Sequence, residues 1–288
     1  MAAQRDKTEA ASQMTTRNPL SQDGTPTQLQ HPIDLALVVD LADTRSKQAV
    51  ATGLTAVVEQ LHGRFGEHLR VGFIGFRDYR SQHEVRGRFE TIALTENFGQ
   101  LCSSVTSILG APSRDTPSDV SGALEACRAL AWRRSECTRI AIVITQAPCH
   151  GQRFHEGLDG DSFLDDFPAG DPGGLDPESI MEQMAKDAVH VYFDSGSEGT
   201  ASRTGRMISI LRAAYTKVAN NPSKSGTVEL WPALGTGSVL GFASAIVEVV
   251  SRAARLDGRT PRKHASLPTP AQLTNIAANS GEAEGTLL

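Results

Sequence analysis

The sequence predicts an α/β fold: a three-layer, doubly wound, mostly parallel six-stranded sheet of Rossmann-like topology, with one antiparallel edge strand. Three observations indicate it. Short segments are apolar throughout, which is typical of strands covered on both faces, as in DLALVVD (34–40), LRVGFIGF (69–76) and RIAIVIT (139–145). Helical patterns alternate with these segments. The first two strands are about thirty residues apart with a helix between them, the spacing of a right-handed βαβ unit.

Each element has its own signal. The helix expected over about 46–65 carries apolar residues on one face, at Val50, Leu54, Val57, Val58 and Leu61. EVRGRFETIAL (84–94) alternates in polarity, which indicates a half-exposed, antiparallel edge strand. The same patterns predict further helices at about 97–109, 117–132, 176–187, 203–218 and 238–256, and further strands at about 188–193 and 227–233.

Composition excludes some classes of function. The chain of 288 residues has a formal net charge of -5 and a pI near 5.9, so it lacks the basic field that nucleic acid or anionic lipid requires. No segment approaches the roughly 20 apolar residues of a membrane span, and the first residues contain no signal-peptide core. We therefore expect a cytoplasmic protein with no nucleic-acid or membrane partner, whose 4 cysteines are reduced thiols.

The ends of the chain differ from the middle. Residues 1–30 and 256–288 are rich in small and polar residues and poor in clustered aliphatic ones, which predicts disordered tails. One domain is expected over residues 31–255. Within it, the segment 147–175 is rich in Gly, Pro and Asp, and it is longer than most loops of compact domains. Such a loop is typically functional or disordered.

The familiar nucleotide-binding motifs are missing. The first strand is followed by DLADT rather than by the glycines that let a pyrophosphate approach the backbone. The later GTGSVLG (235–241) lacks the lysine of a P-loop and is expected to start the last helix. We therefore expect no kinase activity and no catalytic residues.

Polar residues follow the predicted parallel strands at four places. These are Asp40, Arg77 with Asp78, Gln146 and Asp194. The carboxyl ends of parallel strands share one edge of a doubly wound sheet, and ligands bind there. Oxygen atoms from these loops, with those of the polar loop before the helix at 117, suit a hard divalent cation.

Four longer segments resemble one family. RVGFIGFRDYR, DTPSDVSGALEACRALAWRRSECTRIAIVITQAPCHG, RFH followed by DDFPAGDP, and TGRMISILRAAY together resemble von Willebrand factor type A domains, in the branch attached to alpha-type protein kinases. The resemblance covers about residues 33–253. It implies the fold already predicted, with the carboxyl edge as the surface that recognises another protein and the 147–175 loop as its variable part.

The resemblance also implies a metal-ion-dependent adhesion site. In the family this site combines an Asp-x-Ser/Thr-x-Ser loop, a Thr or Asp of a second loop and an Asp after the fourth strand. The matching positions here are Asp40, Ala42 and Thr44 in the first loop, Asp115 and Thr116 in the second, and Gln146. Ala42 lacks a hydroxyl and Gln146 lacks a charge, although Asp43 offers a substitute carboxylate. The site is therefore expected to be partly degenerate, holding Mg²⁺ or Mn²⁺ weakly or having lost them.

Several of these residues also have local explanations. Thr116 and Pro117 form a helix start by themselves, with Thr116 as the N-cap and Asp119 near the positive end of the helix dipole. Asp40 has an alternative role at a helix N-terminus. Arg77 and Asp78 are explained equally by an ion pair that braces loops at the sheet edge.

Cys149, His150 and His155 form a separate cluster just after the fourth strand. Zn²⁺ can be held by a cysteine and histidines together with an acid such as Asp165 or Asp171, but the spacing matches no strong zinc pattern. A Cys–His nucleophile is a second alternative, for which the sequence shows neither a base nor an oxyanion hole. A third interpretation is that these side chains pin the loop against the sheet.

The resemblance thus implies a non-catalytic protein-binding module, for which a link to alpha-kinase signalling is one expectation. The predicted partner-binding rim consists of Arg77, Asp78, Cys149, His150 and His155. Its partner is another protein, for which a separately encoded kinase is one candidate. The alternative is a hydrolase or zinc-site protein built around the cysteine and the two histidines.

Overall fold

The computed structural model describes one folded unit in detail. The chain divides into two units, residues 1–30 and 31–288, and the first lies outside the described residues. Described are residues 32–79, 87–108, 110, 116–134, 136–155, 160–168, 170–194, 198–219, 227–231 and 239–257. The predicted disordered tails fall outside these ranges except at residues 256 and 257, where the prediction began the tail too early, because Leu256 still belongs to the last helix.

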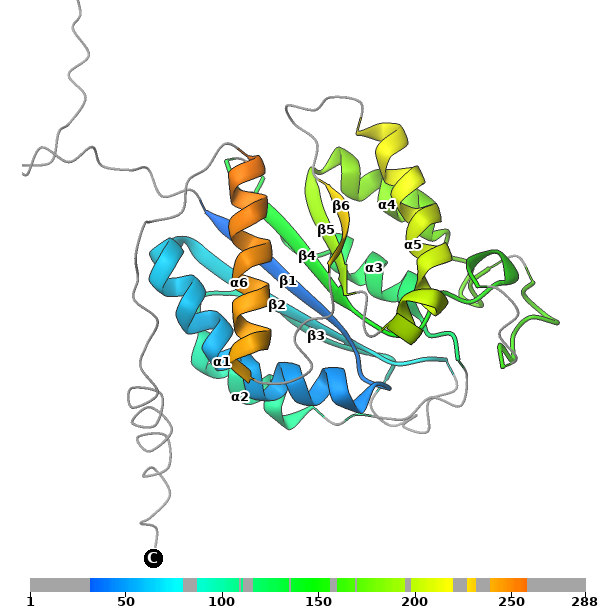
Figure 1. The fold of residues 1–288 in the computed structure, drawn as a ribbon, viewed down its shortest axis with the longest axis horizontal. Helices are drawn as coiled ribbons and strands as arrows, with labels where there is room; N and C mark the ends of the chain where they lie inside the picture. Colours follow the sequence, from blue (N-terminus) through cyan, green and yellow to red (C-terminus); the bar gives the residue numbers. More distant parts are fainter. Residues whose placement is uncertain are drawn as a thin grey trace, which may run out of the picture. The chain divides into compact units, whose positions relative to one another are not determined.

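The sheet confirms the predicted fold class. In the described part of the chain its strands follow the order β3-β2-β1-β4-β5-β6 (Figure 1). All neighbouring pairs are parallel except β2 with β3, so the edge strand runs antiparallel as expected. The strands are β1 (Ile33–Asp40), β2 (Leu69–Phe76), β3 (Phe89–Thr95), β4 (Thr138–Ile144), β5 (Val189–Asp194) and β6 (Val228–Trp231).

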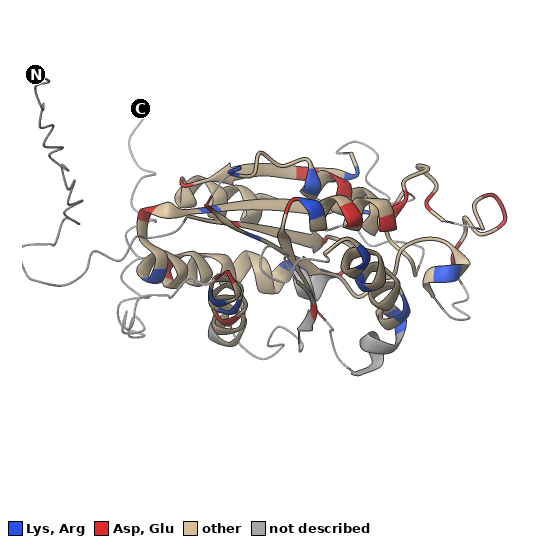
Figure 2. Ribbon diagram, turned by 90° about the horizontal axis from the view of Figure 1, so that it is seen from above, with Lys and Arg blue, Asp and Glu red and all other residues tan. Residues whose placement is uncertain are grey.

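Helices cover both faces of the sheet (Figures 1 and 2). One face packs against α1 (Thr44–Phe65), α2 (Phe98–Ser107) and α6 (Val239–Leu256). The other packs against α3 (Val120–Arg128), α4 (Pro177–Lys186) and α5 (Glu198–Val218). Two short 3-10 helices, η1 (Gly66–His68) and η3 (Gln152–Phe154), lie in the connections.

The central strand β1 explains why its sequence has no polar alternation. Leu35, Leu37 and Val39 enter one core, whereas Ala36 and Val38 enter the other, and all are fully buried. Side chains of a strand point alternately to its two faces, so a strand covered on both sides must be apolar at every position. The run ends at Asp40, on the carboxyl edge.

The start of α3 corrects a prediction. The helix begins at Val120 and its N-cap is Asp119, which accepts a 2.8 Å hydrogen bond from Gly122 N. Thr116 is therefore not the cap. The physical reason is a tertiary contact: the backbone N–H of Ser118 donates to Pro148 O at 3.0 Å, which holds this segment against the loop after β4 instead of in a helical turn.

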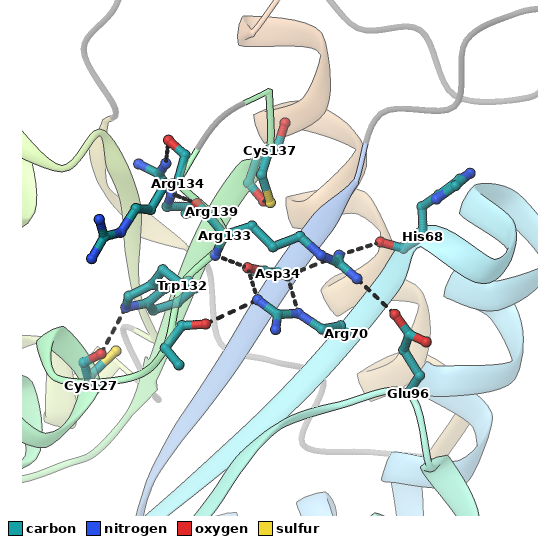
Figure 3. A network of polar contacts seen from close by, with 12 residues as sticks. Asp34, His68, Arg70, Glu96, Cys127, Trp132, Arg133, Arg134, Cys137 and Arg139 are labelled. Atoms are coloured by element: carbon teal, nitrogen blue, oxygen red, sulfur yellow. Dashed lines mark hydrogen bonds and ion pairs between the residues drawn. The ribbon is translucent and has the colours of Figure 1, made fainter.

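The opposite, amino edge of the sheet is closed by an ion network that the sequence did not indicate (Figure 3). Asp34 is fully buried near the start of β1. Its carboxylate accepts two hydrogen bonds from the Arg70 guanidinium, at 2.9 and 2.6 Å, and two from Arg133, at 2.8 Å from the backbone N and 3.1 Å from Nη1. Arg133 also pairs with Glu96 at 2.8 Å. One carboxylate thus joins β1, β2 and the segment before β4.

Candidate binding edge at the carboxyl ends of the strands

Asp40 ends β1 as a buried carboxylate with protein donors on both oxygens. Oδ1 accepts from the backbone N of Ala42 at 2.9 Å, and Oδ2 accepts from the hydroxyl of Thr145 at 3.1 Å. Only 2% of the residue is exposed. Burial raises the pKa of Asp40 from 3.8 to about 6, and the two hydrogen bonds offset part of this rise. The loops after β1 and β4 are therefore joined at this carboxylate.

Gln146 makes a second link between the same two loops. Its side-chain Nε2 donates to Asp43 Oδ2 at 2.9 Å. Asp43 therefore turns toward Gln146, the residue at the position where the resemblance led us to expect an acid. The sequence analysis considered Asp43 as a substitute ligand, and here its carboxylate accepts a hydrogen bond from an amide instead.

The remaining candidate ligands are only partly described. Thr44 begins α1, and its side chain lies outside the described residues, as does the whole of Asp115. Thr116 contacts the long loop, because its backbone N donates to Gly160 O at 3.3 Å. Glycine suits position 160 for two reasons. Its φ of +121° is unfavourable for other residues, and a Cβ atom at this position would lie only 3.2 Å from the Thr116 hydroxyl oxygen. The contact ties the second loop to residue 160.

The described part of this edge fits a divalent cation poorly. Both oxygens of Asp40 already accept hydrogen bonds, and Gln146 directs an N–H group, rather than an oxygen, at Asp43. Within the described ranges, no group of three or more His, Cys, Asp or Glu side chains is arranged to hold a metal ion. Mg²⁺ requires several oxygen ligands in near-octahedral geometry. In the described residues, hydrogen bonds join the loops after β1 and β4 directly.

The five residues predicted to form the partner-binding rim are all buried. Their exposed fractions are 2% or less, so they cannot contact a partner directly, and that prediction is wrong for this structure. The residues are Arg77, Asp78, Cys149, His150 and His155. Three of them belong to the long loop and face inward, Asp78 contacts His150 of that loop, and Arg77 is held by Gly87 and Glu90. The sequence identified polar residues after strands correctly but gave no information on what lies above them.

Arg77 and Asp78 hold neighbouring segments. The Arg77 guanidinium forms an ion pair with Glu90 of β3 at 3.3 Å and donates to Gly87 O at 3.2 Å. Asp78 accepts from Nε2 of His150 at 2.7 Å. The two residues therefore brace the loops at this edge, each with a partner on a different segment.

His150 lies between two carboxylates beneath the loop. Nε2 is 2.7 Å from Asp78 Oδ1, and Nδ1 is 3.0 Å from Asp161 Oδ1. Burial lowers the pKa of the imidazole, but the hydrogen bonds to Asp78 and Asp161 outweigh it and raise the pKa from 6.5 to about 9. His155 Nε2 is 3.3 Å from Asp161 Oδ2. At neutral pH the cluster is thus a buried imidazolium between carboxylates, which differs from a zinc site, where histidine must be neutral.

Cys149 lacks the properties of a nucleophile. Its thiol is fully buried, and burial raises its pKa from 9.0 to about 12. A reactive cysteine needs a lowered pKa and access to solvent. The backbone N of Cys149 lies 3.1 Å from the sulfur of Met207 in α5, and its side chain belongs to the core on that face of the sheet. This supports the interpretation that the segment pins the loop.

Two buried aspartates hold the long loop in place. Asp161 accepts from the backbone N of Gly151 at 3.0 Å and of Phe163 at 3.1 Å. Asp171 accepts from the Tyr79 hydroxyl at 2.9 Å and from the backbone N of Leu175 at 3.1 Å. Asp161 and Tyr79 were not predicted, and Asp171 was considered only for zinc. The sequence signal that could have pointed to them was the high Asp content of this loop.

A second series of contacts connects Tyr79 to the start of α3. The Arg88 guanidinium lies 4.1 Å above the centre of the Tyr79 ring and pairs with Asp119, the N-cap of α3, at 2.7 Å. Burial raises the pKa of Asp119 to about 6, while Gly122 N and Arg88 act in the opposite direction. The loop, β2, β3 and α3 thus form one braced structure.

The exposed part of the edge is the crest of this loop, residues 165–168. All four of these residues are exposed, and Phe167 is 41% exposed, one of the few large apolar side chains in the described residues to be so. Behind the crest is a pocket of about 580 Å³. Its lining is Arg153, Asp166, Phe167, Pro168, Gly170, Asp171, Gly174, Leu175, Asp176 and Pro177. We call it the loop pocket.

Comparison with known proteins gives one sequence relative. No protein-family model matches the chain. The alpha-protein kinase vwkA of Dictyostelium discoideum is 27% identical over 153 residues, which is 53% of this chain and 22% of the kinase. The chain therefore spans less than a quarter of the length of that relative.

Solved structures with a similar backbone include a bacterial pilus adhesin and a bacterial membrane protein. The pilus adhesin SpaC from Lactobacillus rhamnosus GG has a TM-score of 0.46 and 16% identity over 78% of this chain and 31% of its own. An aerotolerance-related membrane protein from Bacteroides fragilis has a TM-score of 0.43 and 11% identity over 76% of this chain and 99% of its own. Among the described residues, no helix has the length and apolar character to cross a membrane.

Proposed function

We propose that the chain is a non-catalytic protein-binding module that recognises its partner with the carboxyl edge of its sheet, independently of a divalent cation or with only weak dependence on one. The observation that carries the proposal is the contrast within this edge. The residues that could bind a metal or act as a nucleophile are buried and contact one another. The crest at 165–168, in contrast, is exposed on a loop that hydrogen bonds hold in place. A rigid, exposed loop suits binding, because little conformational entropy is lost when a partner docks.

Cation independence is supported by the bonding of the two loops. Asp40 with Thr145 and Gln146 with Asp43 link them through hydrogen bonds. A cation would compete with these donors for the carboxylate oxygens and would lose part of its own hydration. Any binding of Mg²⁺ or Mn²⁺ to Asp40, Thr44, Asp115, Thr116 and Gln146 is therefore proposed to be weak.

A link to alpha-kinase signalling belongs to the same proposal. It is supported by the likeness of 153 residues to an alpha-protein kinase of which this chain spans 22%. We propose that the partner is a separate protein, with a kinase as the first candidate, and that they meet in the cytoplasm. The alternative enzyme around Cys149 is disfavoured by the buried thiol and its raised pKa.

A capture experiment tests the proposal. The purified chain is immobilised and exposed to native extract, in EDTA or in about 10 mM Mg²⁺, and retained proteins are then tested for direct binding. A first variant replaces the exposed crest, 165–168, with Gly and Ser. As a matched control, Arg134→Ser changes an exposed residue near the amino edge. We expect a partner that binds in both buffers and is lost only with the crest variant. A partner lost with the control alone, or none that depends on the crest, contradicts the proposal.

Replacement is preferable to deletion of the whole loop. Residues 149, 154 and 155 of that loop are buried, and Asp161 and Asp171 anchor it through several hydrogen bonds. Deleting 147–175 would expose the core beneath, so a loss of binding would report unfolding. Exchanging four exposed residues leaves those contacts intact.

A further inference from the structure

We infer that the loop pocket is a docking site for a basic segment of a partner protein, in which lysine or arginine is next to an apolar side chain. The inference rests on the proposed function and specifies the chemistry of its partner. It is drawn from three properties of the pocket: its rigid walls, its excess of carboxylates and the apolar crest on its rim.

The walls of the pocket are fixed before any partner arrives. Gln152 N donates to Pro168 O at 3.2 Å, which ties the crest to η3. Gly173 N donates to the Tyr79 hydroxyl at 3.0 Å, and Asp171 accepts from that same hydroxyl. The rear wall is the first turn of α4, capped by Asp176, which accepts from Glu178 N at 3.3 Å. A preformed pocket binds a short segment without a large ordering cost.

The charges in the pocket favour a cation. Its lining contains the carboxylates of Asp166, Asp171 and Asp176 against a single basic side chain, Arg153. Arg153 already pairs with Asp176 at 3.3 Å and with Glu178 at 2.5 Å. The pKa of Asp176 is lowered, because the hydrogen bonds from Ser179 and Glu178 outweigh the effect of burial, so this carboxylate stays ionised. From residue 165 to the end of α4 the chain carries Asp165, Asp166, Asp171, Asp176, Glu178 and Glu182 against a single basic residue, Lys186.

An acidic or phosphorylated ligand fits less well. A helix N-terminus attracts anions through its free N–H groups and its dipole. At α4, however, Asp176 already accepts from the first turn, and Pro177 has no N–H group to offer. Arg153 faces two acids of the protein itself. A further anion would meet carboxylates rather than donors.

The apolar part of the pocket sets the second requirement. Phe167 is 41% exposed on the rim, and Pro168, Leu175 and Pro177 line the interior. Covering an exposed aromatic ring adds affinity in proportion to the apolar area removed from water. A ligand with both a basic and an apolar side chain uses both features. A purely basic ligand is attracted only by the carboxylates, and salt weakens this electrostatic attraction.

The chain's own basic segment is excluded as an intramolecular ligand. Arg259, Arg262 and Lys263 follow closely on the end of α6. That end lies at the amino edge, because Asp257 is 3.0 Å from Nε2 of His190, the second residue of β5. Six extended residues span at most about 21 Å, roughly the length of β5 alone. That reach is too short to pass round the helices to the loop pocket as well, so this segment does not supply the ligand.

Peptide binding to the full chain tests the inference. The probe is a fluorescent peptide in which two Lys–Arg pairs flank a leucine, and binding is measured by anisotropy at about 50 mM and about 300 mM NaCl. Two comparison peptides have glycine in place of leucine, or Asp and Glu in place of Lys and Arg. The variants are Asp166→Asn and Phe167→Ser, both exposed lining residues, so neither should affect folding. Asp165→Asn is the matched control, because Asp165 is the exposed neighbour outside the lining.

We expect the basic peptide with leucine to bind, and each lining variant to weaken it about threefold or more, the size of one surface interaction. Asp165→Asn should weaken it less than twofold. The inference is overturned if the acidic peptide binds as well, if the two Asp variants have equal effects, or if the basic peptide does not bind. Self-association of the chain that Phe167→Ser abolishes would assign the pocket to a second copy and also overturn it.

The two proposals fail separately. If the peptide does not bind but the captured partner still depends on the crest, only the inference about a basic ligand is wrong. If no captured protein depends on the crest, the proposed function is wrong as well.

Discussion

The side-chain amide of Gln146 donates a 2.9 Å hydrogen bond to the carboxylate of Asp43, and this bond joins the loops after β4 and β1. An amide makes this contact without a bridging cation, because its N–H group is a donor and the carboxylate is an acceptor. Two carboxylates in the same places would repel each other unless a cation lay between them. We therefore expect an acid at position 146 to make this edge depend on a cation.

Gln146→Asp combined with Ala42→Ser should make the edge dependent on a cation. We expect the double variant to be less stable than the wild type in EDTA and to recover in about 10 mM Mg²⁺. A site with a dissociation constant near 1 mM would add about 1.4 kcal/mol to the free energy of unfolding. Urea unfolding in the two buffers measures this. An equal gain for the wild-type chain would show that Gln146 does not prevent cation binding.

Asp40→Asn should stabilise the fold at pH 7.5. The pKa of Asp40 is raised from 3.8 to about 6 by burial, so its destabilising charge is absent below pH 3.8 and fully present above pH 6. This shift corresponds to at most about 3 kcal/mol. Asparagine keeps an oxygen for Ala42 N and introduces no charge. Urea unfolding at pH 7.5 and pH 4 should show a gain that shrinks at the lower pH. A variant less stable than the wild type at pH 7.5 would contradict this account.

His150 should make stability fall at alkaline pH. Its pKa is raised from 6.5 to about 9, so its stabilising contribution is complete below pH 6.5 and is lost as the pH rises through 9. The shift corresponds to at most about 3 kcal/mol. We expect His150→Gln to be less stable than the wild type at pH 6, with a difference that narrows by pH 9.5. His68→Gln, at an exposed histidine, is the control. A difference independent of pH would mean that His150 is neutral.

Cys149 should react slowly with iodoacetamide at pH 7.5. Its thiol is fully buried with a pKa near 12, whereas Cys102 is partly exposed. Mass spectrometry of the native chain should find Cys102 modified before Cys149, and all four cysteines modified in urea. Rapid alkylation of Cys149 in the native chain would reveal a stabilised thiolate and revive the enzyme alternative.

The architecture could be predicted from the sequence because its signals are local. The apolar runs of β1, β2 and β4 indicate strands buried on both faces, and Asp176 with Pro177 marks the start of α4, where the structure also begins it. The start of α3 could not be predicted in this way. Thr116 and Pro117 have the local pattern of a cap, but Ser118 donates to Pro148, thirty residues further along, and this contact decides the outcome.

The sequence predicted where the site residues lie in the fold, but not whether they are exposed or buried. The sequence places Asp40, Asp78 and Gln146 at one edge, because parallel strands end there. Whether such a residue faces solvent depends on what the long loop does above it. That depends on pairs such as Asp161 with His150 and Asp171 with Tyr79, which are brought together only by the tertiary structure. The rim residues were therefore predicted to contact a partner, whereas in the structure they hold the loops in place.

Asp34→Ala should be among the most destabilising single changes at the amino edge. The carboxylate is fully buried and accepts four hydrogen bonds, and its loss leaves Arg70 and Arg133 facing each other without a counter-charge (Figure 3). Breaking a buried ion pair costs about 3–5 kcal/mol, and because both arginines are partly exposed we expect the lower part of that range. Glu96→Gln is the control, since this partner of Arg133 is 59% exposed and its pair should contribute under about 1 kcal/mol. Urea unfolding measures both variants. Equal losses for the two would mean that Asp34 acts as an ordinary surface charge, in spite of its burial beneath two guanidinium groups.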